Sequence, residues 1–118
     1  MCEYAISFLG APYRYGGTSK SGIDCSGLIV RIYQDKCGIS LPHSARRLFE
    51  EGNALSLRSL EVGDLVFFRQ GRGTPPSHVG MYLGNGRFIH SESGRGVIIT
   101  KMGNRYYKPR YAGARRIL

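Results

Sequence analysis

A cysteine at the start of a helical pattern and a histidine in a later strand pattern are the most informative residues of this sequence. Cys25 lies in the segment Asp-Cys-Ser-Gly, and His78 lies in the segment Ser-His-Val-Gly. The first N–H groups of a helix are unpaired and carry a partial positive charge, which favours a thiolate there. A nearby imidazole accepts the thiol proton. The pair therefore predicts a cysteine nucleophile with a histidine base.

The position of the cysteine within its helix indicates where a cleft would form. Cys25 begins an apolar stripe that continues at Leu28, Ile29 and Ile32, so its side chain is expected to face the sheet on which the helix packs. The alternative is a small core residue, as cysteine often is. The polar neighbour Asp24 favours the catalytic interpretation, because a plain core position does not need it.

A second histidine, His90, follows the turn at residues 84–86. If all three turn residues form the loop, Leu83 pairs with Arg87, and His78 and His90 become diagonal neighbours on one face. A two-residue turn would direct His90 to the opposite face. We predict the three-residue loop, and with it a hydrogen bond by which His90 orients the His78 ring.

The patterns predict helices first and strands second, which is typical of an α+β fold with an antiparallel sheet of about five strands. The expected helices are 2–9, 25–36 and 45–51, each ending at or near a glycine. The expected strands are 64–69, 78–83, 87–91, 97–100 and 111–117. A chain of 118 residues accommodates one domain, spanning 1–118.

The charge of the chain is +9, and no acidic residue follows Glu92. Such a field favours a polyanionic partner, and nucleic acid, an anionic membrane surface and an anionic cell-wall polymer all qualify. A solvated basic face is the plain alternative. No nucleic-acid-binding motif supports the first candidate, so no nucleic-acid partner is predicted. No apolar run approaches the roughly 20 residues that span a bilayer, so no integral membrane segment is expected.

The three cysteines form no CxxC pair, so neither a disulfide framework nor a metal site is predicted. Cys2 is expected on the inner face of the first helix together with Ala5, Ile6 and Leu9. His43, at the entry to the third helix, is a minor candidate for a substrate contact. No cofactor is predicted.

The order and spacing of these segments resemble the NlpC-type cysteine peptidases, which cut bacterial cell-wall peptides. The resemblance covers nearly the whole chain. The segments that carry it are 10–17, 22–28, 41–42, 63–68, 77–82, 88–91 and 113–116. Each alone would be weak, but their order and spacing together are specific, and they identify the chain as a single NlpC-type domain.

The resemblance implies a role for each matching residue. Cys25 matches the nucleophile, His78 the general base and His90 the polar third member. The backbone N–H of Cys25 would contribute to the oxyanion hole, and Tyr13 matches a tyrosine beside the thiol. The fold implied is papain-like, with the cysteine helix packed on the sheet that carries the histidines.

The resemblance also implies a substrate and a location. Asp24 and Ser77 match positions that contact a free amino group of the substrate in some members. The expected reaction is hydrolysis of the peptidoglycan stem peptide between D-glutamate and a diamino acid. The expected location is the cell envelope or the exterior, although no export signal is visible, and phage-associated delivery is another route. Two alternatives stay open: an acyltransferase or amidase acting on another acyl substrate, and a non-catalytic cell-wall-binding module.

Overall fold

The computed structural model describes residues 1–118. Its α-helices are α1 (Cys2–Ile6), α2 (Cys25–Cys37) and α3 (Ala45–Leu48), and its short 3-10 helices are η1 (Leu57–Ser59) and η2 (Lys108–Arg110). Its strands are β1 (Thr18–Ser19), β2 (Gly22–Ile23), β3 (Asn53–Leu55), β4 (Leu65–Arg69), β5 (Pro76–Gly84), β6 (Arg87–Glu92), β7 (Gly96–Lys101) and β8 (Tyr111–Arg116).

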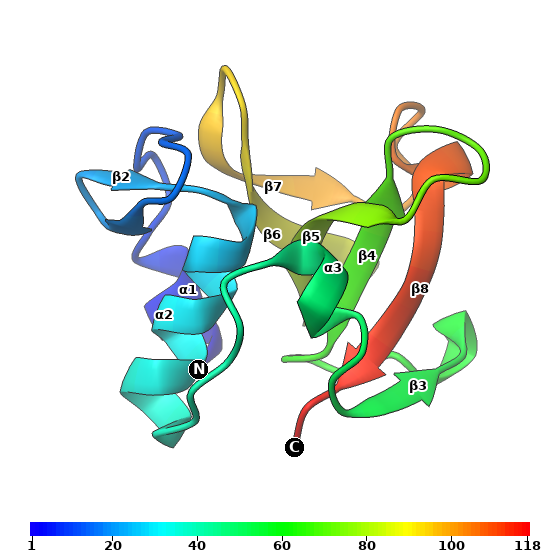
Figure 1. Ribbon diagram of the computed structural model, residues 1–118, viewed down its shortest axis with the longest axis horizontal. Coiled ribbons are helices and arrows are strands. Elements are labelled where there is room, and N and C mark those ends of the chain that lie inside the picture. The colour runs from blue at the N-terminus through cyan, green and yellow to red at the C-terminus, as the bar shows by residue number, and fades with distance from the viewer.

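The predicted α+β fold is confirmed, with a larger sheet than expected. Six antiparallel strands pair in the order β3-β8-β4-β5-β6-β7, and β1 and β2 form a separate small ribbon. Figure 1 shows α1 and α2 on one side of the molecule and the curved sheet on the other. The strands that the sequence patterns missed, β1 to β3, have two or three residues each, too few for a periodic signal.

Helix α2 forms because its two ends are capped and one face is apolar. Asp24 accepts a hydrogen bond from the Gly27 N–H at 2.7 Å, and Gly38 ends the helix in the left-handed conformation. Leu28, Ile29 and Ile32 are fully buried in the core between the helix and the sheet. The helix therefore sets the position of Cys25, its first residue.

The other two helices are shorter than predicted because each closes with tighter turns. After α1, the N–H of Phe8 bonds to the Ala5 carbonyl, three residues back, so that Ala5 and Phe8 share the buried face. Ile6 and Leu9 are 41% and 44% exposed, which corrects their predicted place on the inner face, whereas Ala5 is buried and Cys2 packs against the core as predicted. Bonds of the same spacing follow α3 at residues 50 and 51.

In the β5–β6 hairpin, the two histidines lie on the same face of the sheet, as predicted, but the loop is shorter than the predicted three residues. Gly84 pairs with Arg87, so the turn is the two residues Asn85 and Gly86, with φ of 53° and 71°. A bulge between Tyr82 and Gly84 then shifts the register by one residue. Two errors of opposite sense therefore cancel, and the histidines still share one face.

The two faces of the sheet have different coverings. Val79, Met81 and Ile89 belong to the main core beneath α2. On the opposite face, Phe68, Phe88 and Tyr107 form a second, smaller cluster with Val66 and Ala114. None of the helices combines the length and apolarity that crossing a bilayer requires.

Gly27 provides a test of how the loop before α2 locks the helix start. A methyl group there would overlap the carbonyl oxygen of Gly17 and lie 2.8 Å from Asp24 Oδ1. Alanine gains about 1 kcal/mol in helix propensity, but overpacking of this kind costs about 3 kcal/mol. We expect Gly27→Ala to lower the melting temperature by several degrees, measured by thermal unfolding.

Gly103→Ala is the matched control, because no atom lies within 4 Å of a methyl group added there. A Gly27→Ala protein that melts at or above the temperature of the Gly103→Ala protein would contradict this account of the helix start.

Candidate active site

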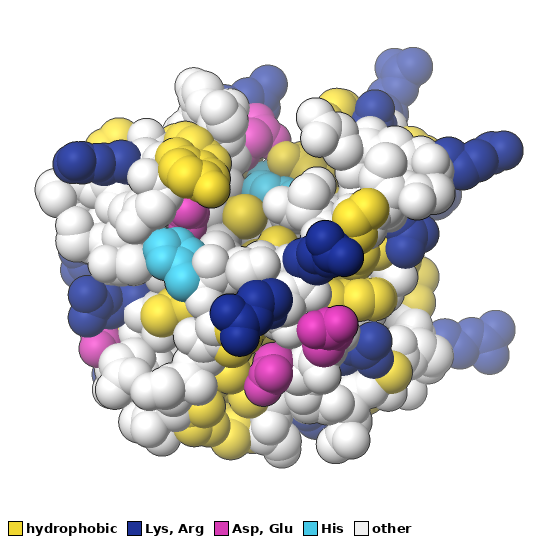
Figure 2. Space-filling model, in the orientation of Figure 1, with side chains coloured by type: hydrophobic (Ala, Val, Ile, Leu, Met, Phe, Trp, Pro, Cys, Tyr) yellow, Lys and Arg dark blue, Asp and Glu magenta, His cyan; other side chains and the backbone are white.

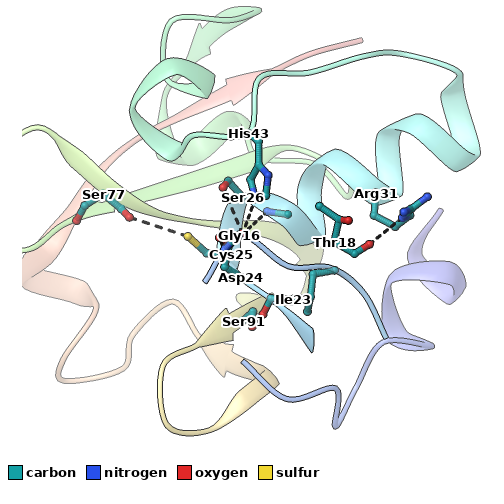
Figure 3. Close-up of polar contacts among 11 residues, drawn as sticks. Gly16, Thr18, Ile23, Asp24, Cys25, Ser26, Arg31, His43, Ser77 and Ser91 are labelled. Carbon is teal, nitrogen blue, oxygen red and sulfur yellow. Dashed lines mark hydrogen bonds and ion pairs between the residues drawn. The ribbon is translucent and has the colours of Figure 1, made fainter. Parts of the chain in front are cut away.

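Cys25 lies at the N-terminal end of α2, against the first residues of β5. Its sulfur is 4.0 Å from the carbonyl oxygen of Ser77, the residue before His78 (Figure 3). Because Cys25 is the first residue of the helix, its own N–H has no acceptor within the helix. The predicted juxtaposition of the cysteine helix and the histidine strand is present in the structure.

Burial is the main influence on the thiol. It raises the pKa of Cys25 above its ordinary value, and the Asp24 carboxylate adds to that effect. The backbone N–H groups of Val79, Ser26 and Cys25 itself act in the opposite direction and lower the pKa. The resting group at neutral pH is therefore the thiol, and a base must take its proton for the sulfur to react.

The two histidines are joined in a line of hydrogen bonds that ends at a third residue. His78 Nε2 lies 2.8 Å from His90 Nδ1, and His90 Nε2 lies 2.7 Å from Thr100 Oγ1. His90 is fully buried, whereas His78 is half-buried. The predicted hydrogen bond between the histidines is thus present, and Nδ1 of His78 is the ring nitrogen that this line does not use.

Thr100 was not predicted from the sequence. It lies on β7, where it pairs across the sheet with Phe88 and not with the histidine that it contacts. The expected strand at 97–100 included it, but no local motif marks a threonine as the diagonal neighbour of a buried imidazole. The signal becomes available only once the β6–β7 register is known.

Burial also controls the charge of both rings. It lowers the pKa of His78 to about 4, and together with the neighbouring ring it lowers the pKa of His90 to about 3. Glu92 acts in the opposite direction on His78. Both imidazoles are therefore neutral near pH 7, as an acceptor of the thiol proton must be.

Tyr107 encloses the histidines from the second cluster. Its ring stacks on His78 with centroids 5.5 Å apart, and meets His90 edge to face at 5.0 Å. Its hydroxyl donates to Glu92 Oε1 at 2.5 Å. Tyr107 was not predicted from the sequence as a site residue. The structure instead places it where it restricts the rotation of the His78 ring.

A cleft of about 620 Å³ opens beside His78, and Tyr13 and Ser77 line it. Figure 2 shows a hollow on this face with a histidine recessed inside it, and a second histidine on the open surface. The cleft is predominantly cationic, with Arg69, Arg95 and Arg110 against the single acid Glu92. No three His, Cys, Asp or Glu side chains gather where they could hold a metal ion.

Tyr13 and Asp24, both predicted site residues, lie close to the thiol. Burial raises the pKa of Tyr13, and the nearby Cys25 and Asp24 raise it further. Asp24 is buried, and its carboxylate is engaged by Gly16, Gly27 and His43. The structure therefore places Tyr13, Asp24 and the Ser77 carbonyl near the thiol of Cys25.

Comparison with known protein families matches residues 10–116 to the NlpC/P60 family. The chain is 44% identical over 118 residues to murein DD-endopeptidase MepS/murein LD-carboxypeptidase of Escherichia coli (strain K12), covering 100% of this chain and 61% of that protein. It is 37% identical over 115 residues to gamma-DL-glutamyl hydrolase of Bacillus subtilis (strain 168), covering 97% of this chain and 28% of that one.

The structure of an NlpC/P60 family protein from Bacillus cereus ATCC 10987 superposes with a TM-score of 0.91 at 39% identity. That match covers 100% of this chain and 40% of the other. The present chain thus spans about three fifths or less of the length of these relatives.

The buried, neutral histidines predict a loss of stability in mild acid. In the unfolded chain each protonates near its ordinary pKa of 6.5, but in the folded chain only near 4 for His78 and 3 for His90. Between these values the unfolded state binds more protons, so stability falls as the pH is lowered from about 6.5 towards 4. Each ring contributes up to about 1.4 kcal/mol per pH unit.

Urea unfolding at about pH 7 and about pH 5 measures this loss. His90→Asn removes one titrating ring, so the variant should lose less stability over the same interval than the unsubstituted protein. An equal loss in both proteins would show that His90 is not held neutral by the fold.

Proposed function

The chain belongs to the NlpC/P60 family and has its papain-like fold, and from this premise we propose that it is a cysteine peptidase of bacterial peptidoglycan. The reaction is hydrolysis of an amide bond in the stem peptide. The proposal rests on the chain of hydrogen bonds that runs from His78 through His90 to Thr100, beside a thiol at the start of α2. A cysteine and a histidine used only for packing would not need such a line.

The line of hydrogen bonds supports one proton arrangement. His78 can accept the thiol proton at Nδ1 only if its own proton is on Nε2, where it is donated to His90 Nδ1. His90 then carries its proton on Nε2 and donates it to Thr100 Oγ1. Because Thr100 Oγ1 accepts the His90 proton, His90 Nδ1 is free to accept from His78 Nε2. This arrangement favours the His78 tautomer whose Nδ1 can take the proton of Cys25.

The catalytic cycle follows from these positions. His78 Nδ1 takes the thiol proton as Cys25 Sγ attacks the amide carbon, and the backbone N–H of Cys25 donates to the resulting oxyanion. The C–N bond then breaks, His78 gives its proton to the leaving amine, and a thioester remains. Water attacks the thioester while His78 takes a proton from it, and the acid product leaves as the thiol re-forms. Tyr13 is proposed to stand beside the oxyanion.

The leaving amine must lie next to His78, because His78 protonates it. The amine half of the substrate would then occupy the cleft that His78, Arg69, Arg95 and Arg110 line. Stem peptides carry carboxylates, and guanidinium groups pair well with carboxylates. The net charge of +9 also suits an anionic polymer. Both features support action at the cell envelope.

The names of the relatives refer to the cleavage of different bonds: murein DD-endopeptidase, murein LD-carboxypeptidase and gamma-DL-glutamyl hydrolase. We propose the bond between D-glutamate and the diamino acid as the one cut here. Ser77, which lines the cleft, is proposed to contact the substrate.

Thr100 tests the proton arrangement. Thr100→Val keeps the shape of the side chain but removes the hydroxyl that accepts from His90, and we expect kcat/KM to fall about tenfold, the cost of one lost hydrogen bond. Thr100→Ser keeps the hydroxyl and should stay close to the original value. Equal activity of the Val and Ser proteins would contradict the proposed role of this hydrogen bond.

Cys25→Ala tests the reaction itself, with mass spectrometry of purified muropeptides as the measurement. The unsubstituted protein should produce fragments split after D-glutamate, and Cys25→Ala should lower the rate at least about 10³-fold. Cys37→Ala, which alters another free cysteine at the far end of α2, should remain active.

Other outcomes of this assay separate the alternatives. Fragments split at another stem-peptide bond would keep the peptidase and change the bond. Cleavage by Cys25→Ala at the original rate would exclude the thiol mechanism. No cleavage of any muropeptide would favour a non-catalytic wall-binding module or a different acyl substrate.

A further inference from the structure

The Asp24 carboxylate is occupied by donors from three separate parts of the chain. Oδ1 accepts from the Gly27 N–H at 2.7 Å and lies 2.8 Å from His43 Nε2, and Oδ2 accepts from the Gly16 N–H at 2.7 Å. Ser26 Oγ lies at 3.5 Å from Oδ1. The Asp24 side chain is only 8% exposed. Little of its capacity to accept hydrogen bonds is left for a ligand.

His43 reaches this carboxylate from outside the helix that Asp24 caps. It lies in the segment between α2 and α3, just before Ser44, which caps α3. Its side chain is 32% exposed, so it belongs to the surface around the site. In Figure 3 its ring points at Asp24, on the side of Cys25 away from Ser77. His43 thus covers the carboxylate from the solvent side.

The single acid that lines the cleft, Glu92, is engaged as well. Glu92 Oε1 accepts from the Tyr107 hydroxyl, and Oε2 pairs with Arg95 at 3.2 Å. The other charged groups that line the cleft are arginines. An ammonium group in the amine half of the substrate would therefore meet no free carboxylate in the cleft, and the terminal amino group, which belongs to the acyl half, has Asp24 as its candidate partner.

We propose that His43 is a specificity-determining residue: by occupying the Asp24 carboxylate, it frees the enzyme from any need for an amino group at the start of the stem peptide. The substrates are then stem peptides whose first residue is acylated, as in peptides still joined to the glycan through an amide. This inference rests on the proposed peptidase function. It differs from the amine contact that resemblance to the family predicts for Asp24.

The test compares two versions of one stem peptide, with the terminal amino group either free or acetylated. The ratio of kcat/KM for the free to the acetylated peptide is measured for the unsubstituted protein, His43→Ala and His43→Gln. Alanine leaves Asp24 Oδ1 open to a ligand, whereas glutamine keeps a donor that can cover it. Thermal unfolding of each protein checks that it is folded, and His43→Ser replaces His43→Ala if the latter is not.

We expect a ratio within about threefold of one for the unsubstituted protein and for His43→Gln. In His43→Ala the ratio should rise about tenfold in favour of the free amine, chiefly through KM, because an exposed carboxylate gains a charge-assisted partner.

Two results would overturn the inference while leaving the proposed function intact. One is an unsubstituted protein that prefers the free amine tenfold or more, since the substrate would then be displacing His43. The other is an unchanged ratio in the His43→Ala or His43→Ser protein. Failure of the unsubstituted protein to cleave either peptide would instead overturn the proposed function, and this inference with it.

Discussion

The rest of the site depends on the hydrogen bonds that the Asp24 carboxylate accepts at the start of α2. Its bond to the Gly27 N–H begins α2 at Cys25, and its bond to the Gly16 N–H ties the preceding loop to the helix start. Glycines at 17 and 27 allow this close approach, since a side chain at either would strike backbone. The position of Cys25 as the first residue of α2 and the placement of its sulfur against β5 follow from these hydrogen bonds of the Asp24 carboxylate.

The second half of the site depends on the two-faced sheet. Alternation along β5 and β6 sends Val79 and Ile89 under α2, and His78 and His90 to the opposite face. There the small cluster around Phe68 and Tyr107 removes water from the rings, which lowers their pKa values and keeps them neutral. One sheet thus supplies a core on one face and the two neutral histidines on the other, and Cys25 lies where α2 begins beside β5.

Sequence patterns predicted the parts of the site that local signals encode. The apolar stripe of α2 located Cys25 at the start of that helix, and the alternation along the strands located His78 and His90 on one face. The hairpin loop was wrong in detail, because a bulge at Leu83 has no compositional signature and its one-residue shift compensated for the shorter turn. Thr100, Tyr107 and the His43–Asp24 contact were not predicted, since each joins segments whose proximity only the folded chain defines.

The most direct test of the central claim, that His78 takes the proton of Cys25, is the alkylation rate of each cysteine in the folded protein. Iodoacetamide labelling, followed residue by residue with mass spectrometry, compares the unsubstituted protein with His78→Gln. The account predicts that Cys25 reacts at least about tenfold more slowly in the variant, because its base is lost, while Cys2 and Cys37 react at unchanged rates. Equal rates at Cys25 in both proteins would contradict it.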